Sequence, residues 1–275
     1  MIELPEAVTL ARQLADTLTG RTIRRAQAAS SPHGFAWYFG DPAEYDQRLA
    51  GRTITGAVAR GGLPEICADD MRVCFADGVN VRYLAPGTAV PAKHQLLLDF
   101  DDGSAIVCTV QMYGGLWAFH EGLNGNPYYL VADEKPSPLD GRFDAGYFES
   151  LLAGCPAQMS AKAVLATQQR IPGLGNGVLQ DVLWRAGVHP KRKLGTVPAA
   201  GREKLYDAVK TVLAEMVAGG GRSSEKDLFG DPGGYTVAMG GKTLGTGCPA
   251  CGTPIQKLSY LGGAVYVCET CQPLG

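Results

Sequence analysis

Two kinds of hydrophobic periodicity divide the chain. Near the N-terminus, apolar residues recur at helical spacing, which predicts a helix over residues 3–19 that ends at Gly20. From Thr22 to about Phe119 the pattern changes to short strand-like runs, separated by turn sequences such as Asp77-Gly78. The predicted strands cover residues 53–58, 71–75, 80–84, 95–100 and 105–110. Many short strands with glycine turns indicate a β-sandwich or barrel.

Helical spacing returns after Asp144. It predicts helices over residues 148–152, 160–169, 177–186 and 201–217. Residues 120–141 contain proline-rich turn sequences and are expected to form a linker, while the glycine-rich residues 219–247 are expected to be ordered only in part. The chain therefore joins a strand-rich first half to a helical second half.

The segment over residues 169–193 joins a glycine-rich turn to an apolar-periodic helix. The turn is Ile-Pro-Gly-Leu-Gly-Asn at residues 171–176, and Gly187 stands where a helix C-terminus needs a residue that tolerates positive φ. Because glycine has no Cβ, a ligand can approach the amide groups at the start of the helix, and such groups bind anions. On its own, the segment fits an anion site and a plain connector between two helices equally well.

Charge is divided unevenly along the 275 residues. The net charge is −2, yet residues 1–149 hold 12 basic and 19 acidic residues, a net charge of −7, while residues 150–275 hold 13 and 8, a net charge of +5. This asymmetry indicates a polyanionic partner for the second half, although a solvated acidic surface explains the first half as well. No apolar run approaches the roughly 20 residues of a membrane span, and the N-terminus carries acidic residues instead of a basic signal region. We expect a soluble, cytoplasmic protein.

Four of the eight cysteines form a metal-binding pattern at the C-terminus. Cys248 and Cys251 make one C-x2-C pair, Cys268 and Cys271 make another, and 16 residues separate the pairs. This spacing is typical of a structural zinc site, in which four thiolates close the coordination shell. The residues between the pairs predict a β-hairpin around Gly262-Gly263, whose tip either contacts DNA or is merely held together by the metal. The other four cysteines are scattered and fit small buried side chains.

These features together resemble the formamidopyrimidine-DNA glycosylase and endonuclease VIII family of base-excision repair enzymes. The resemblance covers nearly the whole length, and the helix–two-turn–helix followed by a four-cysteine ribbon is its most specific part. The matching segments are MIELPE at residues 1–6, Lys93-His94, Gly114, Pro138-Leu139-Asp140, residues 169–190, residues 230–235 and Cys271-Gln272.

The resemblance implies an α+β fold with four parts. These are a β-sandwich domain with a leading helix at residues 1–132, a linker at 133–139, a helix–two-turn–helix DNA-binding domain at 140–235, and a zinc ribbon at 236–275. Duplex DNA that is damaged or abasic would lie between the two domains of a nucleoid-associated monomer. Members of the family extrude the damaged base, an event that costs least at a damaged or mismatched site, and attack the sugar carbon with the N-terminal amine. An α-amine is partly neutral near physiological pH and can form a Schiff base.

The reactive end of the chain departs from the family pattern. The family's first mature residue is proline, whereas this chain has Ile2, so the free amine is expected on Met1, about 3–4 Å further out. Glu3 matches the catalytic glutamate and Glu6 the second one, although Glu3 also fits a carboxylate that stabilises a helix N-terminus. The candidate catalytic residues are Met1, Ile2, Glu3 and Glu6.

Other functional positions are altered as well. The family's hairpin lysine falls near Arg60-Gly61, its base-replacing Arg-Phe pair at residues 111–113, and its ribbon arginine at Gly262-Gly263. Met112 or Tyr113 could still fill the gap that a flipped base leaves. The expected DNA contacts are His94, Tyr113, Lys162, Gly173, Gly175, Asn176 and Lys257.

Three hypotheses follow from this pattern. The first is a DNA glycosylase with altered AP lyase chemistry, favoured by Glu3, Glu6 and the N-terminal helix. The second is a non-catalytic binder of damaged or abasic DNA, favoured by the missing proline, lysine and arginine. A binder of structured RNA is the third. Lys162 and Asn176 also have a plain reading, as a solvated lysine and a helix cap.

Overall fold

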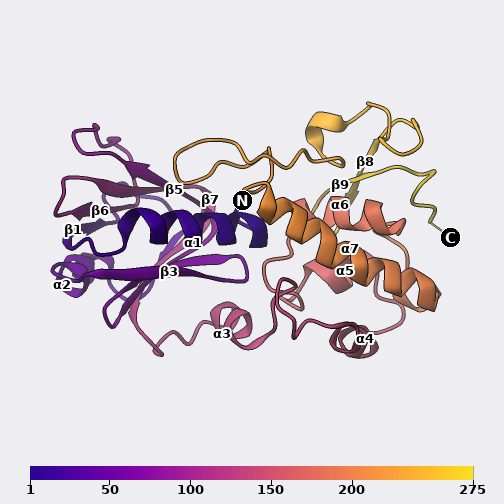
Figure 1. Ribbon diagram of the computed structural model, residues 1–275, viewed down its shortest axis with the longest axis horizontal. Helices are drawn as coiled ribbons and strands as arrows, with labels where there is room; N and C mark the ends of the chain where they lie inside the picture. The colour runs from indigo at the N-terminus through magenta and orange to yellow at the C-terminus, as the bar shows by residue number, and fades with distance from the viewer. Residues whose placement is uncertain (275) are drawn as a thin grey trace. The chain divides into compact units, whose positions relative to one another are not determined.

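A computed structural model describes residues 1–274 and divides into two compact units (Figure 1). The first unit comprises Met1–Asp133 and Ser224–Gly233, and the second comprises Glu134–Ser223 and the chain from Gly234 onward. Strands dominate the first unit and helices the second, as the change of periodicity predicts, and the α+β class is confirmed. Within residues 1–274, no helix combines the length and the hydropathy that a membrane span needs.

Seven strands of the first unit form one hydrogen-bonded sheet in the order β1-β6-β7-β5-β4-β3, and β2 pairs with β7 in parallel. The long β5 and β7 pair along most of their length and join the two ends of the sheet. Helix α1 (Leu4–Leu18) packs on β3 and β4, and its leucines enter one core with β1, β5, β6 and β7. The strands are β1 (Ile23–Ala28), β2 (Ala36–Tyr38), β3 (Ile54–Arg60), β4 (Leu63–Ala68), β5 (Met71–Leu84), β6 (Leu96–Phe100) and β7 (Ala105–His120). The short helices are η1 (Pro42–Glu44), α2 (Tyr45–Leu49) and α3 (Pro127–Glu134).

Strand β5 contains a bulge close to the N-terminus of the chain. The pairing of β5 with β7 shifts between Asp77 and Val79, and Asp77 has a left-handed backbone with φ of 53°. A Cβ on Gly78 would lie 2.5 Å from the Tyr113 carbonyl oxygen, so only glycine fits this position. The bulge turns the Asp77 carbonyl toward the start of the chain, where it accepts a hydrogen bond from the Ile2 N–H at 3.0 Å.

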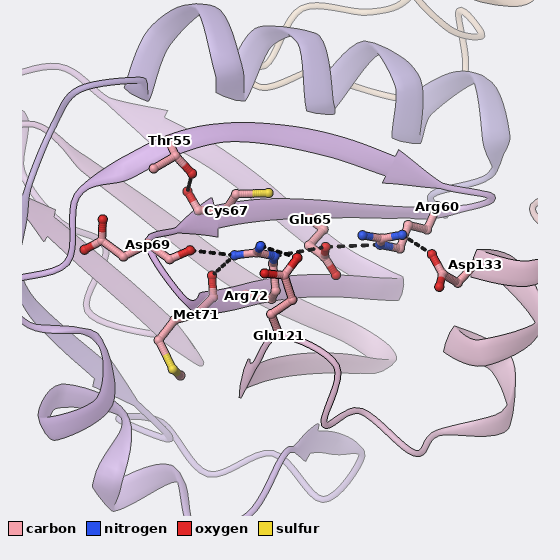
Figure 2. A network of polar contacts seen from close by, with 9 residues as sticks. All are labelled: Thr55, Arg60, Glu65, Cys67, Asp69, Met71, Arg72, Glu121 and Asp133. Carbon is pink, nitrogen blue, oxygen red and sulfur yellow. Dashed lines mark hydrogen bonds and ion pairs between the residues drawn. The ribbon is translucent and has the colours of Figure 1, made fainter.

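A partly buried charge network connects β3 and β4 with helix α3, which lies within the range expected to be a linker (Figure 2). Glu65 on β4 is fully buried and accepts a hydrogen bond from Arg60 Nε at 3.1 Å. Arg60 also forms an ion pair with Asp133 at the end of α3 and lies over the Tyr129 ring. Residues 120–141 therefore contain a helix, whose Asn126-Pro127 start resembles a turn in sequence. The contacts of Asp133 and Tyr129 with Arg60 could not be predicted, because these residues lie far apart in the sequence.

The described part of the second unit, up to residue 274, contains four α-helices, a β-hairpin and two 3-10 turns. Its elements are α4 (Ala145–Ala153), α5 (Ala161–Ala166), α6 (Asn176–Ala186), η2 (Leu194–Thr196), α7 (Ala199–Ala218), η3 (Gly241–Thr243), β8 (Gln256–Tyr260) and β9 (Gly263–Val267). Helix α6 packs on α7. Helix α5 is shorter than the predicted 160–169 because Gln168 and Gln169 take positive φ values. Strands β8 and β9 form the predicted hairpin.

The glycine-rich residues 219–247 have a defined conformation, contrary to the expectation of partial order. Ser224–Gly233 packs with the first unit, although it falls in the range assigned to the helical domain. Leu228 is fully buried in the sheet core, and its carbonyl accepts the Tyr83 N–H at 3.0 Å. Asp227 accepts a hydrogen bond from the Gln13 side chain at 2.7 Å. These long-range contacts order a segment that local pattern leaves undetermined.

Candidate functional site

A cavity of about 540 Å³ lies in the first unit, between the start of α1, the middle of β5, β7 and the beginning of the 224–233 segment. Its wall includes Met1, Glu6, Arg82, Gln111, Tyr113 and Glu225. A site of this size and polar lining can take a small molecule or an extruded base.

The N-terminal residue is held at this cavity from two sides. The Met1 ammonium donates to Glu225 Oε2 at 2.5 Å, and the next amide, Ile2 N–H, is held by the Asp77 carbonyl. The backbone of Glu225 is held in place by a hydrogen bond that its carbonyl accepts from the Gly233 N–H at 3.2 Å. The segment that was not predictable from local pattern therefore supplies a carboxylate to the first residue of the chain.

The two glutamates at the start of α1 are both buried and both engaged in capping. Glu3 is the N-cap residue, and its N–H donates to the Glu6 carboxylate at 3.2 Å. Together they form a capping box, in which two orphan backbone groups are satisfied reciprocally. Glu6 lines the cavity, and Glu3 is three residues before it. The structure therefore supports a role for Glu3 in capping helix α1, and its catalytic role stays a prediction.

The residues in place of the family's Arg-Phe pair differ in exposure. Met112 is 71% exposed, whereas Tyr113 is half-buried and its ring lies 5.9 Å from that of Trp37. Burial raises the pKa of Tyr113, and the nearby Asp77 carboxylate raises it further. Burial also raises the pKa of Asp77 itself. The cavity edge therefore combines an exposed apolar side chain with a packed aromatic one.

In the second unit, Lys162 and Asn176 meet the tip of the β8–β9 hairpin. Lys162 is 3% exposed, and its ammonium donates to the Tyr260 carbonyl at 2.7 Å. Asn176, the first residue of α6, donates from Nδ2 to the Ala264 carbonyl at 2.9 Å. Burial lowers the pKa of Lys162. The plain reading of Lys162 as a solvated lysine is therefore wrong.

The glycine turn before α6 has the expected form. Gly173 has φ of 79°, a value that favours glycine, and Gly175 is the extended N-cap residue of α6. Gly187 ends the helix in the left-handed conformation, as predicted.

Two other predicted DNA contacts lie elsewhere. His94, in the first unit, is buried, and its Nδ1 lies 2.8 Å from the Pro91 carbonyl oxygen, so its ring packs inside the loop before β6. Lys257 is exposed on β8 in the second unit. The structure thus brings Lys162 and Asn176 together, and separately Met1, Glu6 and Tyr113.

The four C-terminal cysteines gather into one cluster. Their sulfur atoms all lie within 4.8 Å of one another, with Cys248 and Cys271 at 3.8 Å and Cys251 and Cys268 at 3.4 Å. Sulfurs about 3.8 Å apart match a tetrahedral ion with bonds of about 2.3 Å. Hydrogen bonding to Thr253 lowers the pKa of the Cys251 thiol, and the Trp184 indole N–H points at Cys248 Sγ from 3.4 Å. The cluster fits a metal ion with four thiolate ligands.

Comparison with known proteins places the chain. The formamidopyrimidine-DNA glycosylase N-terminal domain matches residues 1–75, and the formamidopyrimidine-DNA glycosylase H2TH domain matches residues 135–227. A formamidopyrimidine-DNA glycosylase from Symbiobacterium thermophilum is 30% identical over 284 residues, covering 100% of this chain and 90% of that protein. The chain belongs to the formamidopyrimidine-DNA glycosylase family. The resemblance noted in the sequence is thereby confirmed.

Solved structures of formamidopyrimidine-DNA glycosylases share the fold. The Thermus thermophilus protein superposes with a TM-score of 0.83 at 26% identity, over 99% of both chains. The Lactococcus lactis protein, in a complex with DNA that contains an abasic site, gives a TM-score of 0.82 at 25% identity, over 98% of this chain and 99% of that one.

Two residues that line the cavity were not predicted from the sequence. Glu225 and Arg82 line the cavity, but they come from a glycine-rich segment and from the middle of a strand. Arg60, near the expected position of the family's lysine, is engaged by Glu65 and Asp133. No local signal identifies these partners, because each pairing depends on the folded chain.

Proposed function

We propose that this member of the formamidopyrimidine-DNA glycosylase family is a base-excision repair protein that binds damaged or abasic duplex DNA and flips the damaged base. The observation that carries the proposal is the pair of donors at the start of α6, where Lys162 and Asn176 converge beside the hairpin tip. Such donors beside a helix N-terminus suit a phosphate group. The net charge of +5 over residues 150–275 supports a polyanionic partner.

The cavity of the first unit is the proposed place of chemistry. A neutral Met1 amine would attack the aldehyde carbon of an abasic sugar, forming an imine and releasing water, with Glu3 or Glu6 handling protons. The contact between the Met1 ammonium and Glu225 directs the amine toward this cavity. Gly173, Gly175, Tyr113, His94 and Lys257 remain proposed DNA contacts.

A non-catalytic binder of abasic DNA is the second candidate. It is favoured by the contact of the Met1 amine with Glu225, which occupies the group that would attack the sugar, and by the ion pairs that engage Arg60. The phosphate contacts of the second unit are the same in both candidates. Chemistry at the N-terminus is therefore the point that separates them.

Zinc is the proposed occupant of the four-cysteine cluster. Cys248, Cys251, Cys268 and Cys271 would hold it, and since all four positions of the ion are filled by thiolates, it would stabilise the ribbon and take no part in catalysis. The proposal also has the protein acting as a monomer associated with the nucleoid.

Borohydride trapping on a duplex with one abasic site tests the proposal. The matched control is a variant with two extra residues ahead of Met1, which moves the amine out of reach, and intact mass identifies the first residue of each protein. A covalent adduct that disappears in the extended variant supports the amine nucleophile. Tight binding of the abasic duplex without any adduct establishes the non-catalytic binder, and equal affinity for intact and abasic duplexes refutes both candidates.

A further inference from the structure

One face of α6 is bonded to the ribbon along its whole length. Asn176, Gln180 and Trp184 are spaced four residues apart, so they lie on the same side of the helix. Asn176 donates to the Ala264 carbonyl, Gln180 contacts β9, and Trp184 points its N–H at Cys248. Beyond the helix, the Val188 carbonyl accepts a hydrogen bond from Gln272 at 3.0 Å. A polar stripe of this kind differs from the apolar stripe by which a helix normally packs.

Gln180 makes the central contact of the stripe with both ends of its amide. Its Nε2 donates to the Ala264 carbonyl at 3.1 Å, and its Oε1 accepts the Tyr266 N–H at 2.9 Å. The side chain is 4% exposed, so it does not reach a bound duplex. The two hydrogen bonds, to Ala264 and Tyr266 of β9, hold that strand in one position against α6.

The Ala264 carbonyl is shared by Gln180 and Asn176, and this sharing sets the direction of the Asn176 amide. An amide nitrogen carries two hydrogens, so Asn176 Nδ2 keeps one for a phosphate oxygen after Ala264 takes the other. The Lys162 ammonium carries three, and the Tyr260 carbonyl takes one of them. Each hairpin carbonyl therefore aims the remaining hydrogens of a donor before any DNA binds.

Gly263 places no side chain over either donor. A Cβ at this position would lie 3.6 Å from Asn176 Nδ2 and 3.6 Å from Lys162 Nζ, so a longer side chain would stand over both nitrogen atoms. The hairpin thus contributes backbone carbonyls to the site in place of a cationic side chain.

We propose that Gln180 is a positioning residue for phosphate binding. It holds the Ala264 carbonyl in place, the carbonyl orients the Asn176 amide, and the amide then meets the phosphate beside the abasic site. This inference rests on the proposed function, and it adds a residue that raises affinity without touching DNA. Preorganised donors bind more tightly because less ordering remains to be done on binding.

A double-mutant cycle tests the inference in the full-length zinc-loaded protein. Gln180→Met removes both hydrogen bonds at nearly constant length, and it is made alone and together with Asn176→Ala. Fluorescence anisotropy with a labelled abasic duplex gives Kd over a series of salt concentrations. Gln47→Met, the same change at an exposed position of α2, is the matched control and should leave Kd unchanged.

We expect Asn176→Ala to weaken binding about tenfold, as the loss of one hydrogen bond to a charged group implies. Gln180→Met should weaken it about fivefold to tenfold, and the slope of log K against log salt should stay unchanged, because Asn176 carries no charge and neutralises no phosphate. The double variant should be within about twofold of Asn176→Ala, because Gln180 acts through that residue.

Two other sets of results would contradict the inference. Wild-type affinity in Gln180→Met, or a double variant whose loss is the product of the two single losses, overturns the positioning role while the phosphate contact stands. Wild-type affinity in Asn176→Ala removes the phosphate contact itself and the inference with it. Zinc content and urea unfolding are measured for every variant. If Gln180→Met loses zinc, Gln180→Glu replaces it, since its carboxylate still accepts from Tyr266 and loses the hydrogen bond to Ala264, and Gln47→Glu then controls for the added negative charge.

Discussion

Removal of the Asp181 carboxylate should destabilise the second unit by about 2–4 kcal/mol. Asp181 lies on α6 and is fully buried. Its two oxygens accept hydrogen bonds from the Tyr235 hydroxyl at 3.0 Å, the Ala238 N–H at 2.9 Å and the Met239 N–H at 2.7 Å. The side chain thereby anchors the chain that leads from the 224–233 segment to the ribbon. Asp181→Ala deprives all three donors of their acceptor.

The magnitude follows from the burial of each donor. Met239 is fully buried, so its orphaned N–H costs about 1–3 kcal/mol. Ala238 and Tyr235 are half-buried, so water can reach them, and each costs about 0.5–1 kcal/mol. Against this, the variant no longer buries a carboxyl group whose pKa is raised by that burial. Asp181→Asn keeps one acceptor oxygen but presents an NH2 group to an N–H donor, and about 1–2 kcal/mol is expected.

Urea unfolding followed by tryptophan fluorescence, with hydrogen exchange of residues 234–240 read by mass spectrometry, measures the effect. The order of stability should be wild type, then Asp181→Asn, then Asp181→Ala, and protection should be lost first at Ala238 and Met239. Asp207→Ala, at an exposed position of α7, is the control. Variants of Asp181 within about 0.5 kcal/mol of wild type, a typical surface effect, would refute the reasoning.

Three further predictions concern other parts of the molecule. Arg60→Met should cost about 3 kcal/mol in urea unfolding, because the more distant Arg72, at 3.9 Å, is then the one cation left within salt-bridge distance of buried Glu65 in the described chain, and a loss equal to that of exposed Arg25→Met would contradict this. The pKa of Asp77 is raised by burial, so the folded state binds its proton more tightly and wild-type stability should fall as pH rises from the ordinary aspartate range through the raised value. Asp77→Asn also tolerates positive φ and should lack that dependence in a series of Tm measurements, whereas superimposable pH profiles would disprove the assignment. Trp184→Phe should release zinc to a chelator several-fold faster through loss of the N–H bond to Cys248, and identical release rates would rule that bond out as a stabiliser of the site.

The elements that sequence predicts well are those whose signal is local. The apolar stripe of α1 and the hairpin between the cysteine pairs were recognisable because their periodicity and turn residues lie within a few positions. Helix α5 ends early because Gln168 and Gln169 adopt left-handed backbone, which neither residue favours in isolation. Helix α3 was missed because it is held by Tyr129 and Asp133, whose partners Arg60 and Phe119 lie on β3 and β7.

The candidate site divides in the same way. Lys162 and Asn176 belong to a helical pattern that local sequence displays, and the hairpin that meets them could be placed by its cysteine pairs. Glu225 was not predictable, since 224 positions separate it from Met1 and nothing in its glycine-rich surroundings indicates which carboxylate turns inward. Gln180 has the spacing of a core position and the chemistry of a surface one, and only its two bonds to β9 explain it.

Because Ser224–Gly233 packs with the first unit, that unit consists of two separate stretches of sequence. This limits where the chain can be divided into fragments. A fragment that stops at Asp133 would lack Leu228, leaving a leucine-sized hole in the sheet core at a cost on the scale of about 2.7–5 kcal/mol. It would also lack the carboxylate that meets Met1. The first unit is therefore not contained in the first 133 residues, so fragments of it for expression or for exchange between family members must carry the ten residues with the sheet, joined to it by a new connection.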